Sequence, residues 1–201
     1  MAQTTTGAEP LLEAAATLVA ESGMGSVTFR QVAVAAGTSP SRVQYYFRTK
    51  SQLIGSVFDR INHQFLVDLG SALTEPPSLD RLRRIVWRWL PLDAQRERRA
   101  RIWAAFAAFA VTDDELAAAA ARFDQQLRDW LATDLDALRT AGQVRPEMSS
   151  AVAAGQLLSL VDGTTLHCLV VPMDRRPSLV EQNLATWFDG LAQPTEGTGG
   201  L

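Results

Sequence analysis

Four helix-start signals limit this chain to folds that are rich in helices. Each is a Ser or Thr followed three residues later by Glu or Gln. At that spacing the hydroxyl oxygen accepts a free backbone N–H of the first turn, and the second side chain bonds back. The four pairs are Thr28–Gln31, Thr49–Gln52, Thr112–Glu115 and Ser178–Glu181. Apolar residues at helical spacing follow each pair, so we expect a helix to begin at all four.

Apolar spacing along the whole chain predicts an all-α protein with about nine helices. No stretch alternates apolar and polar residues over a useful length, so no strand is expected. Gly and Pro residues separate the expected segments. The expected helices cover residues 10–22, 28–36, 39–46, 49–73, 78–90, 93–111, 112–141, 146–170 and 178–191. Residues 193–201, rich in Gly, Thr and Pro, are expected to be a disordered tail.

Composition and hydropathy argue against a membrane protein. Hydrophobic residues make up 47% of the chain and charged residues 20%, with a net charge of −3. The longest apolar run, residues 102–111, is well short of the roughly 18 residues that a membrane span needs. The first ten residues carry neither a basic region nor an apolar segment, so no secretory signal is expected. The single cysteine, Cys168, cannot form an internal disulfide, which fits a cytoplasmic protein.

Basic residues gather in one acid-free segment despite the acidic total. Between residues 28 and 51 the charged residues are Arg30, Arg42, Arg48 and Lys50, which gives a local charge of +4. Because phosphate binding depends on the local field, an acidic chain can still carry a nucleic-acid-binding face. Without a motif around them, four such charges are simply a solvated basic face, which is the usual case.

The segment from residue 29 to residue 48 has the pattern of a helix-turn-helix. Ala33 supplies the small residue that two closely crossing helices need, and Gly37 supplies the positive φ of the tight turn. Ser39 and Pro40 are suited to be the cap and first residue of a second helix. Such a helix can lie in the major groove with its N-terminal residues against base edges. The inward-facing residues are expected to be Val32, Ala36, Val43 and Tyr46.

Three stretches of this segment carry a family pattern. They are GSVTFRQVA at residues 25–33, AGTS at 36–39 and VQYYFRTK at 43–50, with Leu53 after them. Residues 10–53 thereby resemble the DNA-binding domain of the TetR/AcrR family of transcriptional regulators. One departure is Glu9–Pro10, where the family often has a basic residue. The resemblance implies a three-helix DNA-binding domain at residues 8–53, with its helix-turn-helix motif at about 28–47. Helix 49–73 connects it to an effector-binding and dimerisation domain at 74–192.

The resemblance also implies which residues contact DNA. Thr28 and Lys50 match positions that contact phosphate from helix starts. Arg42 is a candidate for guanine and Gln44 for adenine, although either can contact phosphate instead. Gln44 stands where the family often has Tyr, which favours an altered operator preference. The candidate DNA-binding residues are Thr28, Arg30, Gln31, Thr38, Ser39, Pro40, Ser41, Arg42, Gln44, Tyr45, Tyr46 and Lys50. Packing is the more natural role for Tyr46.

The C-terminal region resembles the BetI-type branch of the same family. The shared stretches are LPLD at residues 90–93, RIWAAF at 101–106 and LVDG at 160–163. This domain type occurs with many effectors, so it implies a small-molecule effector without naming one. Candidate effector-pocket residues are Trp87, Trp103, Phe106, Phe109, Phe123, Trp130 and His167. Spacing alone favours a helical core for the aromatic residues and an ordinary helix position for His167, and the resemblance adds the expectation that some of the aromatic residues line a cavity.

An arginine-rich stretch lies between residues 80 and 101. It carries eight arginines against three acids, a local charge of +5. Arg81, Arg84 and Arg88 share one helix face, which is typical of a solvated surface supported by neighbouring ion pairs. A second interpretation is that these arginines attract an anionic ligand.

The last two expected helices favour a homodimer. Ala153, Ala154, Gly155 and Gly163 allow close backbone approach along helix 146–170, and helix 178–191 has an apolar face. Two such helices from each copy can form a four-helix interface. Packing of the same helices within one chain is the alternative. A homodimer would also carry two DNA-binding domains, one for each half of a palindromic DNA site.

No motif in the chain indicates an enzyme. The GxSxG, HExxH, GxxxxGK[ST] and GxGxxG patterns are missing. The two histidines, His63 and His167, fall in different expected domains, and the acidic run 113–115 sits at a helix start, where acids are stabilising. We therefore expect no catalytic residues, metal or cofactor.

The helix-turn-helix pattern and the two family resemblances predict a ligand-responsive DNA-binding regulator. The simplest form is a cytoplasmic repressor that binds a palindromic double-stranded operator as a homodimer and is released by a small molecule. The alternative is a helical small-molecule-binding or adaptor protein without functional DNA binding.

Overall fold

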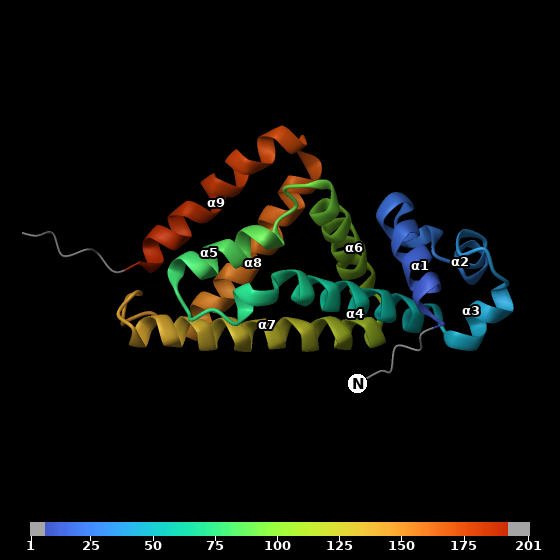
Figure 1. Cartoon of the computed structure of the whole chain (residues 1–201), viewed down its shortest axis with the longest axis horizontal. Helices are drawn as coiled ribbons and strands as arrows, with labels where there is room; N and C mark the ends of the chain where they lie inside the picture. Colours follow the sequence, from blue (N-terminus) through green and yellow to red (C-terminus); the bar gives the residue numbers. More distant parts are fainter. Residues whose placement is uncertain (1–6, 193–201) are drawn as a thin grey trace, which may run out of the picture. The chain divides into compact units, whose positions relative to one another are not determined.

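The computed structural model describes residues 7–192 and shows an all-helical chain over that range (Figure 1). The described part contains no β-strand beyond a single isolated bridge between Val144 and Ala192. This confirms the predicted all-α class. The tail expected at residues 193–201 lies outside the described residues. The α-helices of the described part are α1 (Glu9–Ser22), α2 (Phe29–Ala35), α3 (Pro40–Tyr46), α4 (Lys50–Leu69), α5 (Leu79–Trp89), α6 (Ala94–Ala110), α7 (Asp114–Thr140), α8 (Ser150–Val170) and α9 (Arg176–Leu191).

Two of the four predicted helix-start signals cap their helices as expected. The hydroxyl oxygen of Thr28 accepts the backbone N–H of Gln31 at 3.2 Å at the start of α2. The hydroxyl oxygen of Thr49 accepts the backbone N–H of Gln52 at 3.0 Å at the start of α4. Each cap satisfies an N–H that has no partner inside its own helix, and such caps are worth about 1 kcal/mol.

The other two predicted caps are wrong, by one residue at α7 and by three residues at α9. At α7 the cap is Asp113 rather than Thr112, because its carboxylate accepts the backbone N–H three residues further on at 3.0 Å. The Thr112 hydroxyl instead donates to the Phe109 carbonyl. Helix α9 begins at Arg176 with a proline in its first turn, so Ser178 lies inside the helix and does not cap it. Proline is tolerated there because the first-turn N–H has no helical partner.

The described residues pack as two compact units, which we describe separately. The first unit contains residues 7–70 and 93–123, so α6 and the beginning of α7 pack with the N-terminal helices. The second unit contains residues 71–92 and 124–192, which cover α5, the rest of α7, α8 and α9. The predicted domain boundaries at residues 53 and 74 stay a prediction.

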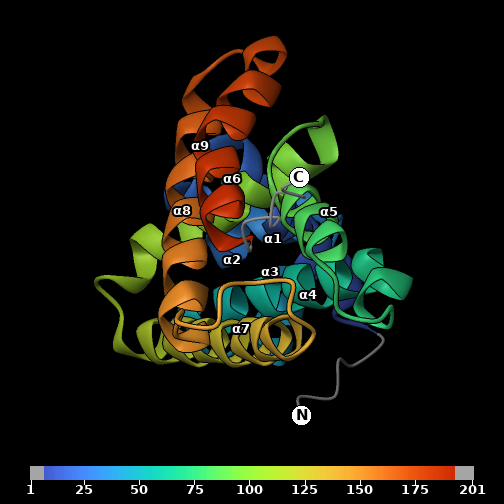
Figure 2. The same cartoon turned by 90° about the vertical axis from the view of Figure 1, so that its left-hand side faces the viewer.

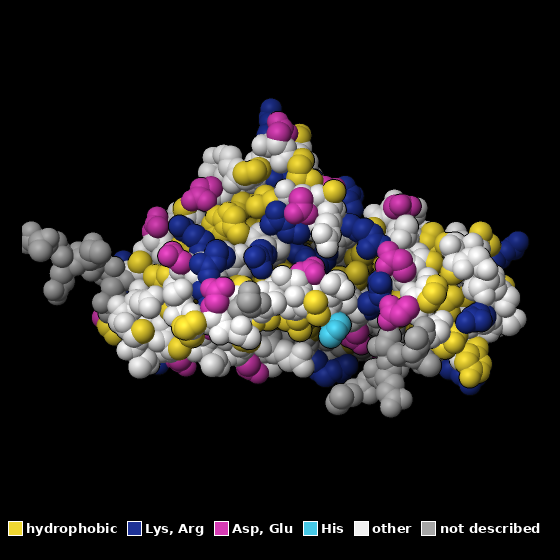
Figure 3. Space-filling view, viewed as in Figure 1, with side chains coloured by type: hydrophobic (Ala, Val, Ile, Leu, Met, Phe, Trp, Pro, Cys, Tyr) yellow, Lys and Arg dark blue, Asp and Glu magenta, His cyan; other side chains and the backbone are white. Residues whose placement is uncertain are grey.

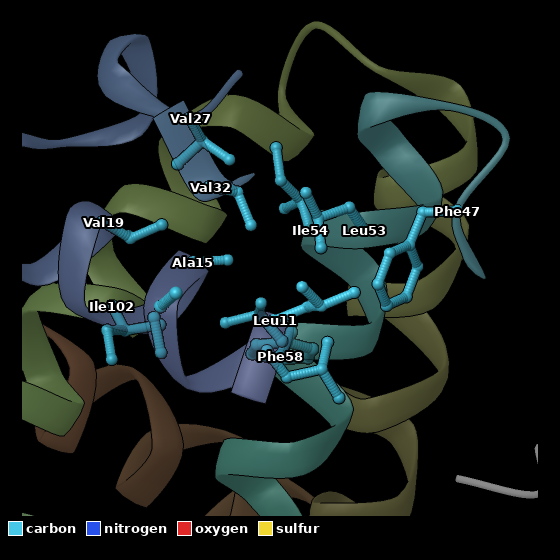
Figure 4. Close-up of a cluster of buried hydrophobic side chains, with 14 of the residues drawn as sticks. Leu11, Ala15, Val19, Val27, Val32, Phe47, Leu53, Ile54, Phe58 and Ile102 are labelled. Carbon is cyan, nitrogen blue, oxygen red and sulfur yellow. The ribbon is translucent and has the colours of Figure 1, made fainter. Parts of the chain in front are cut away.

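Helix α1 forms the centre of the first unit. It contacts α2, α4 and α6. Its small residues Ala15 and Ala16 are fully buried, which lets the neighbouring backbones approach closely. Figure 4 shows the surrounding core, in which side chains from α1, α2, α4 and α6 meet. Phe58 of α4 stacks on Phe106 of α6, with ring centroids 3.7 Å apart.

Four charged residues tie α1 to its neighbours. Arg60 of α4 binds Glu9 and Glu13, each at 2.8 Å, and Arg98 of α6 binds Glu13 at 2.7 Å. These side chains are partly exposed, so each pair contributes modestly to stability. The network gives Glu9 a structural role where the family often has a basic residue.

The second unit contains one hydrophobic core and one buried ion pair. Helix α8 packs along α9 (Figure 2). Ala153 and Ala154 of α8 are completely buried in the core of this unit. Arg81 of α5 binds Asp134 of α7 at 2.6 Å, with 3% and 7% of the two side chains exposed. The prediction of a solvated face is therefore wrong for Arg81, whereas Arg84 and Arg88 are exposed. The charge of Arg81 tolerates burial because Asp134 and two backbone carbonyls surround it.

Within the described range, none of the helices is long and apolar enough to cross a membrane.

Candidate nucleic-acid interface

Helices α2 and α3 form a helix-turn-helix. The turn between them passes through Gly37, whose φ of +63° is in the left-handed region that favours glycine. The backbone N–H of Thr38 donates to the carbonyl of Ala33 at 2.9 Å and closes the turn. Ala33 is 1% exposed where the two helices meet. The predicted roles of Ala33 and Gly37 are confirmed by this geometry.

Helix α3 presents most of its polar side chains to solvent. Its cap is Ser39, whose hydroxyl oxygen accepts the backbone N–H of Arg42 at 3.3 Å, and Pro40 occupies the first turn. Val43 faces inward and is fully buried. The exposed residues of α3 are Pro40, Ser41, Arg42, Gln44 and Tyr45. A helix with one buried apolar residue and a free polar face of this kind can enter a major groove.

The structure brings the twelve predicted DNA-binding residues into one unit and exposes most of them. The exposed members are Thr28, Arg30, Gln31, Ser39, Pro40, Ser41, Arg42, Gln44 and Tyr45. The half-buried members are Thr38, Tyr46 and Lys50. Tyr45 is 76% exposed, which is unusual for an aromatic ring without a partner molecule. Their contacts with DNA stay predictions.

The basic residues around α3 carry uncompensated charge. Arg30, Arg42 and Arg48 make no side-chain hydrogen bond or ion pair with any described residue, and all three are exposed. Arg48 was counted in the local charge but was missing from the predicted contact residues. Its exposure next to the end of α3 makes it a further candidate for phosphate contact. The signal that could have found it was the absence of any acid from residue 28 to residue 51.

Lys50 is partly engaged within the chain. Its Nζ donates to the carbonyl of Met24 at 3.0 Å and lies 5.3 Å from the centre of the Phe109 ring of α6. An ammonium group has three N–H donors, so further donors remain for a phosphate. The predicted phosphate contact stays a prediction, and the contacts with Met24 and Phe109 could not be seen in the sequence pattern.

The start of α4 is joined to the start of α7 by one side-chain hydrogen bond. The hydroxyl of Ser51 donates to Asp113 at 2.5 Å. This bond, together with the backbone N–H that Asp113 accepts as the α7 cap, lowers the pKa of the Asp113 carboxyl below its ordinary value. Asp113 therefore serves as the cap of one helix and as the anchor of another.

Gly7 passes so close to Tyr46 that a side chain would not fit. A Cβ at Gly7 would lie 2.2 Å from the hydroxyl oxygen of Tyr46, the last residue of α3, so alanine must displace the Tyr46 ring from its place against the core of the first unit. We expect Gly7→Ala to lower the free energy of unfolding by about 1–2 kcal/mol. Adding Tyr46→Phe should recover part of this loss, because it removes the hydroxyl oxygen, while Cζ at 3.1 Å still has to shift by a few tenths of an ångström. Urea unfolding of the single and double variants measures both effects.

Gly25 provides a matched control for this prediction. No atom lies within 4 Å of a Cβ placed there, so Gly25→Ala should change stability by about 0.5 kcal/mol or less. Equal unfolding midpoints for Gly7→Ala and Gly25→Ala would contradict the close contact.

The seven predicted effector-pocket residues are divided between the two units. Those that pack against the core of the first unit are Trp103, Phe106, Phe109 and Phe123. Those that pack against the core of the second unit are Trp87 and Trp130. His167 is exposed on α8. A ligand role for this set stays a prediction.

Family models match both parts of the chain. A model described as "Bacterial regulatory proteins, tetR family" matches residues 11–57, which contain the helix-turn-helix. A model described as "BetI-type transcriptional repressor, C-terminal" matches residues 78–193, more than half of the chain. The chain belongs to the TetR family. Both resemblances noted from the sequence are thereby confirmed, and no enzyme family is indicated.

Solved structures of TetR-type regulators have the same fold. A transcriptional regulator from Rhodococcus sp. Rha1 is 29% identical with a TM-score of 0.81, and the match covers 92% of this chain and 96% of the other. A putative transcriptional regulator from Saccharomonospora viridis, solved in complex with choline, is 18% identical with a TM-score of 0.80, covering 94% and 98%. SmeT, the repressor of the Stenotrophomonas maltophilia multidrug efflux pump SmeDEF, is 18% identical with a TM-score of 0.69, covering 98% and 96%. The last two show the fold alone.

No curated protein sequence matches the chain. Family membership, the helix-turn-helix and the exposed polar face of α3 together identify a DNA-binding transcriptional regulator of the TetR family.

Proposed function

We propose that the protein is a ligand-responsive repressor that binds a palindromic operator as a homodimer in the cytoplasm. The observation that carries the DNA-binding part is the exposed face of α3 with its unpaired Arg42, flanked by unpaired Arg30 and Arg48. Because these guanidinium groups are unpaired, no ion pair within the chain has to break before they bind phosphate. Arg42 and Gln44 are the proposed base-reading residues, for guanine and adenine respectively.

Exposed apolar residues on α8 support the homodimer. Val152 is 58% exposed, Leu166 48% and Val170 81%, although all three lie on a helix whose other face is buried. A second copy of the same face would remove this apolar surface from water. Two copies would also present two α3 helices, as a palindrome requires.

Release by a small molecule rests on the C-terminal domain type. The solved relative from Saccharomonospora viridis holds choline, and the domain model matched here is BetI-type. We propose a small-molecule effector for this domain, whose binding favours a state of lower DNA affinity. SmeT, a fold relative named as a repressor, supports repression over activation.

Selection from random duplex DNA by the purified full chain tests this proposal. We expect enrichment of an inverted repeat that two copies of the chain bind together, as measured by the mass of the complex. Enrichment of no sequence at low salt would contradict DNA-binding regulation. It would favour a helical small-molecule-binding or adaptor protein instead.

A further inference from the structure

An unpaired arginine lies against two aromatic rings where α5 meets α9 in the second unit. The guanidinium carbon of Arg83 is 5.6 Å from the centre of the Trp87 ring and 5.2 Å from that of the Phe188 ring. The two rings are themselves 6.0 Å apart, and Trp187 meets Phe188 edge to face at 5.1 Å. We call Arg83, Trp87, Trp187 and Phe188 the α5–α9 patch. The rings hold the guanidinium in place without neutralising its charge.

The donors of Arg83 have no acceptor in the described part of the chain. Arg83 makes no hydrogen bond or ion pair with any described residue, and its Nε is buried without a partner. The next arginine along α5 behaves differently, because Arg84 is exposed and pairs with Glu75. The buried Nε has no acceptor, which destabilises the free protein. The terminal N–H groups of the guanidinium are not buried and also have no acceptor among the described residues, so they can donate to an acceptor brought from outside.

The surface around Arg83 is apolar. Trp87 and Trp187 are half-buried, so part of each ring system is open to solvent, while Phe188 is buried beneath. Figure 3 shows hydrophobic side chains gathered between α5 and α9, with Lys or Arg side chains beside them. The unpaired guanidinium can donate two parallel hydrogen bonds to a carboxylate, and the solvent-exposed parts of the indole rings can contact an apolar group. The surface is therefore complementary to a carboxylate attached to an apolar group.

We propose that the α5–α9 patch binds a small organic carboxylate with an apolar body. The carboxylate accepts two hydrogen bonds from the guanidinium of Arg83, and the apolar body covers Trp87 and Trp187. Neutral or cationic ligands leave the charge and the donors of Arg83 unsatisfied, so they bind more weakly. The site lies within the second unit, and its occupation does not depend on the proposed DNA binding.

Isothermal titration calorimetry of the full chain with 2-naphthoate tests the proposal. We expect saturable binding that weakens by at least about tenfold in Arg83→Gln, because a charge-assisted bidentate contact is lost. Arg84→Gln is the matched control, since Arg84 is paired elsewhere, and it should bind as the wild type does. Arg83→Lys keeps the positive charge but loses the planar pair of donors that a guanidinium offers. Its affinity for 2-naphthoate should therefore fall between those of the wild type and Arg83→Gln. The neutral 2-naphthamide should bind at least about tenfold more weakly than 2-naphthoate.

Three results would overturn the proposal. They are an absence of saturable 2-naphthoate binding by the wild type, equal affinity in Arg83→Gln, and equal affinity for 2-naphthamide. Thermal melting of each variant is recorded alongside, and Arg83→Lys, which preserves size and charge, replaces Arg83→Gln in the comparison if the latter does not fold. None of these readouts involves DNA, so failure here and failure of the proposed regulator function are distinguishable.

Discussion

Replacing Asp134 by alanine is expected to lower the free energy of unfolding by about 3–5 kcal/mol. Arg81 donates to both carboxylate oxygens of Asp134, at 2.7 and 2.6 Å, and both residues are buried. Without Asp134 the guanidinium keeps only the carbonyls of Ala72 and Leu73 as partners, so an uncompensated charge remains inside the second unit. Chemical unfolding followed by circular dichroism measures the loss.

Two further variants test the cause of this loss. Glu75→Ala removes the partner of Arg84 in an exposed pair and should cost under about 1 kcal/mol. The double variant Arg81→Met with Asp134→Leu removes both buried charges and should recover part of the loss, although the two carbonyls then lack their donor. A loss in Asp134→Ala no larger than that in Glu75→Ala would contradict the buried pair.

Replacing Asp162 by asparagine is expected to stabilise the protein at pH 7.5. Burial between α7 and α8, with a smaller contribution from the nearby carboxylate of Asp124, raises the pKa of Asp162 from 3.8 to about 6, while Arg128 opposes the shift. The carboxyl makes no hydrogen bond or ion pair with any described residue. A shift of this size corresponds to about 2–3 kcal/mol that the folded state loses when Asp162 ionises.

The sign of this effect sets its pH dependence. The pKa is higher in the folded than in the unfolded chain, so the folded state binds the proton more tightly. The contribution of Asp162 to stability is therefore most favourable when the pH is below the pKa that Asp162 has in the unfolded chain. This contribution falls as the pH rises towards 6, and it stays low above pH 6. The advantage of Asp162→Asn should be largest at pH 7.5 and small at pH 4.

Unfolding curves at the two pH values measure this difference. Asp189→Asn, at an exposed position of α9, is the control and should change stability little at either pH. An equal advantage of Asp162→Asn at pH 4 and pH 7.5 would contradict the origin of the effect in ionisation.

Local hydrogen-bond patterns explain why so much of the fold could be predicted. The caps at Thr28 and Thr49 are hydrogen bonds between residues three positions apart. Gly37 adopts the positive φ that the tight turn requires at that one position. The failure at Thr112 has a local cause too. Asp113 offers a charged acceptor one residue later, and a carboxylate is the stronger partner for the free N–H groups of a helix start.

Contacts between distant residues explain what could not be predicted. Lys50 reaches Met24, and Arg81 reaches Asp134, across separations of 26 and 53 residues. A count of charges cannot distinguish Arg81, which is buried and paired, from Arg83, which has no acceptor, or from Arg84, which pairs on the surface. The exposed side of α3 could be predicted more easily than these contacts. Helix α3 is short, and its single fully buried residue, Val43, determines which side faces outward.

Binding affinity for the selected palindrome measures whether α3 discriminates between bases. Fluorescence anisotropy at one salt concentration compares this duplex with a scrambled one. The wild type should prefer the palindrome by about 1,000-fold or more. In Arg42→Ala with Gln44→Ala this preference should fall by at least about 100-fold, since base-reading contacts are worth about 1–3 kcal/mol each. Arg48→Ala should weaken both duplexes alike through loss of a phosphate contact. An unchanged preference in the Arg42 and Gln44 double variant would contradict base reading by α3.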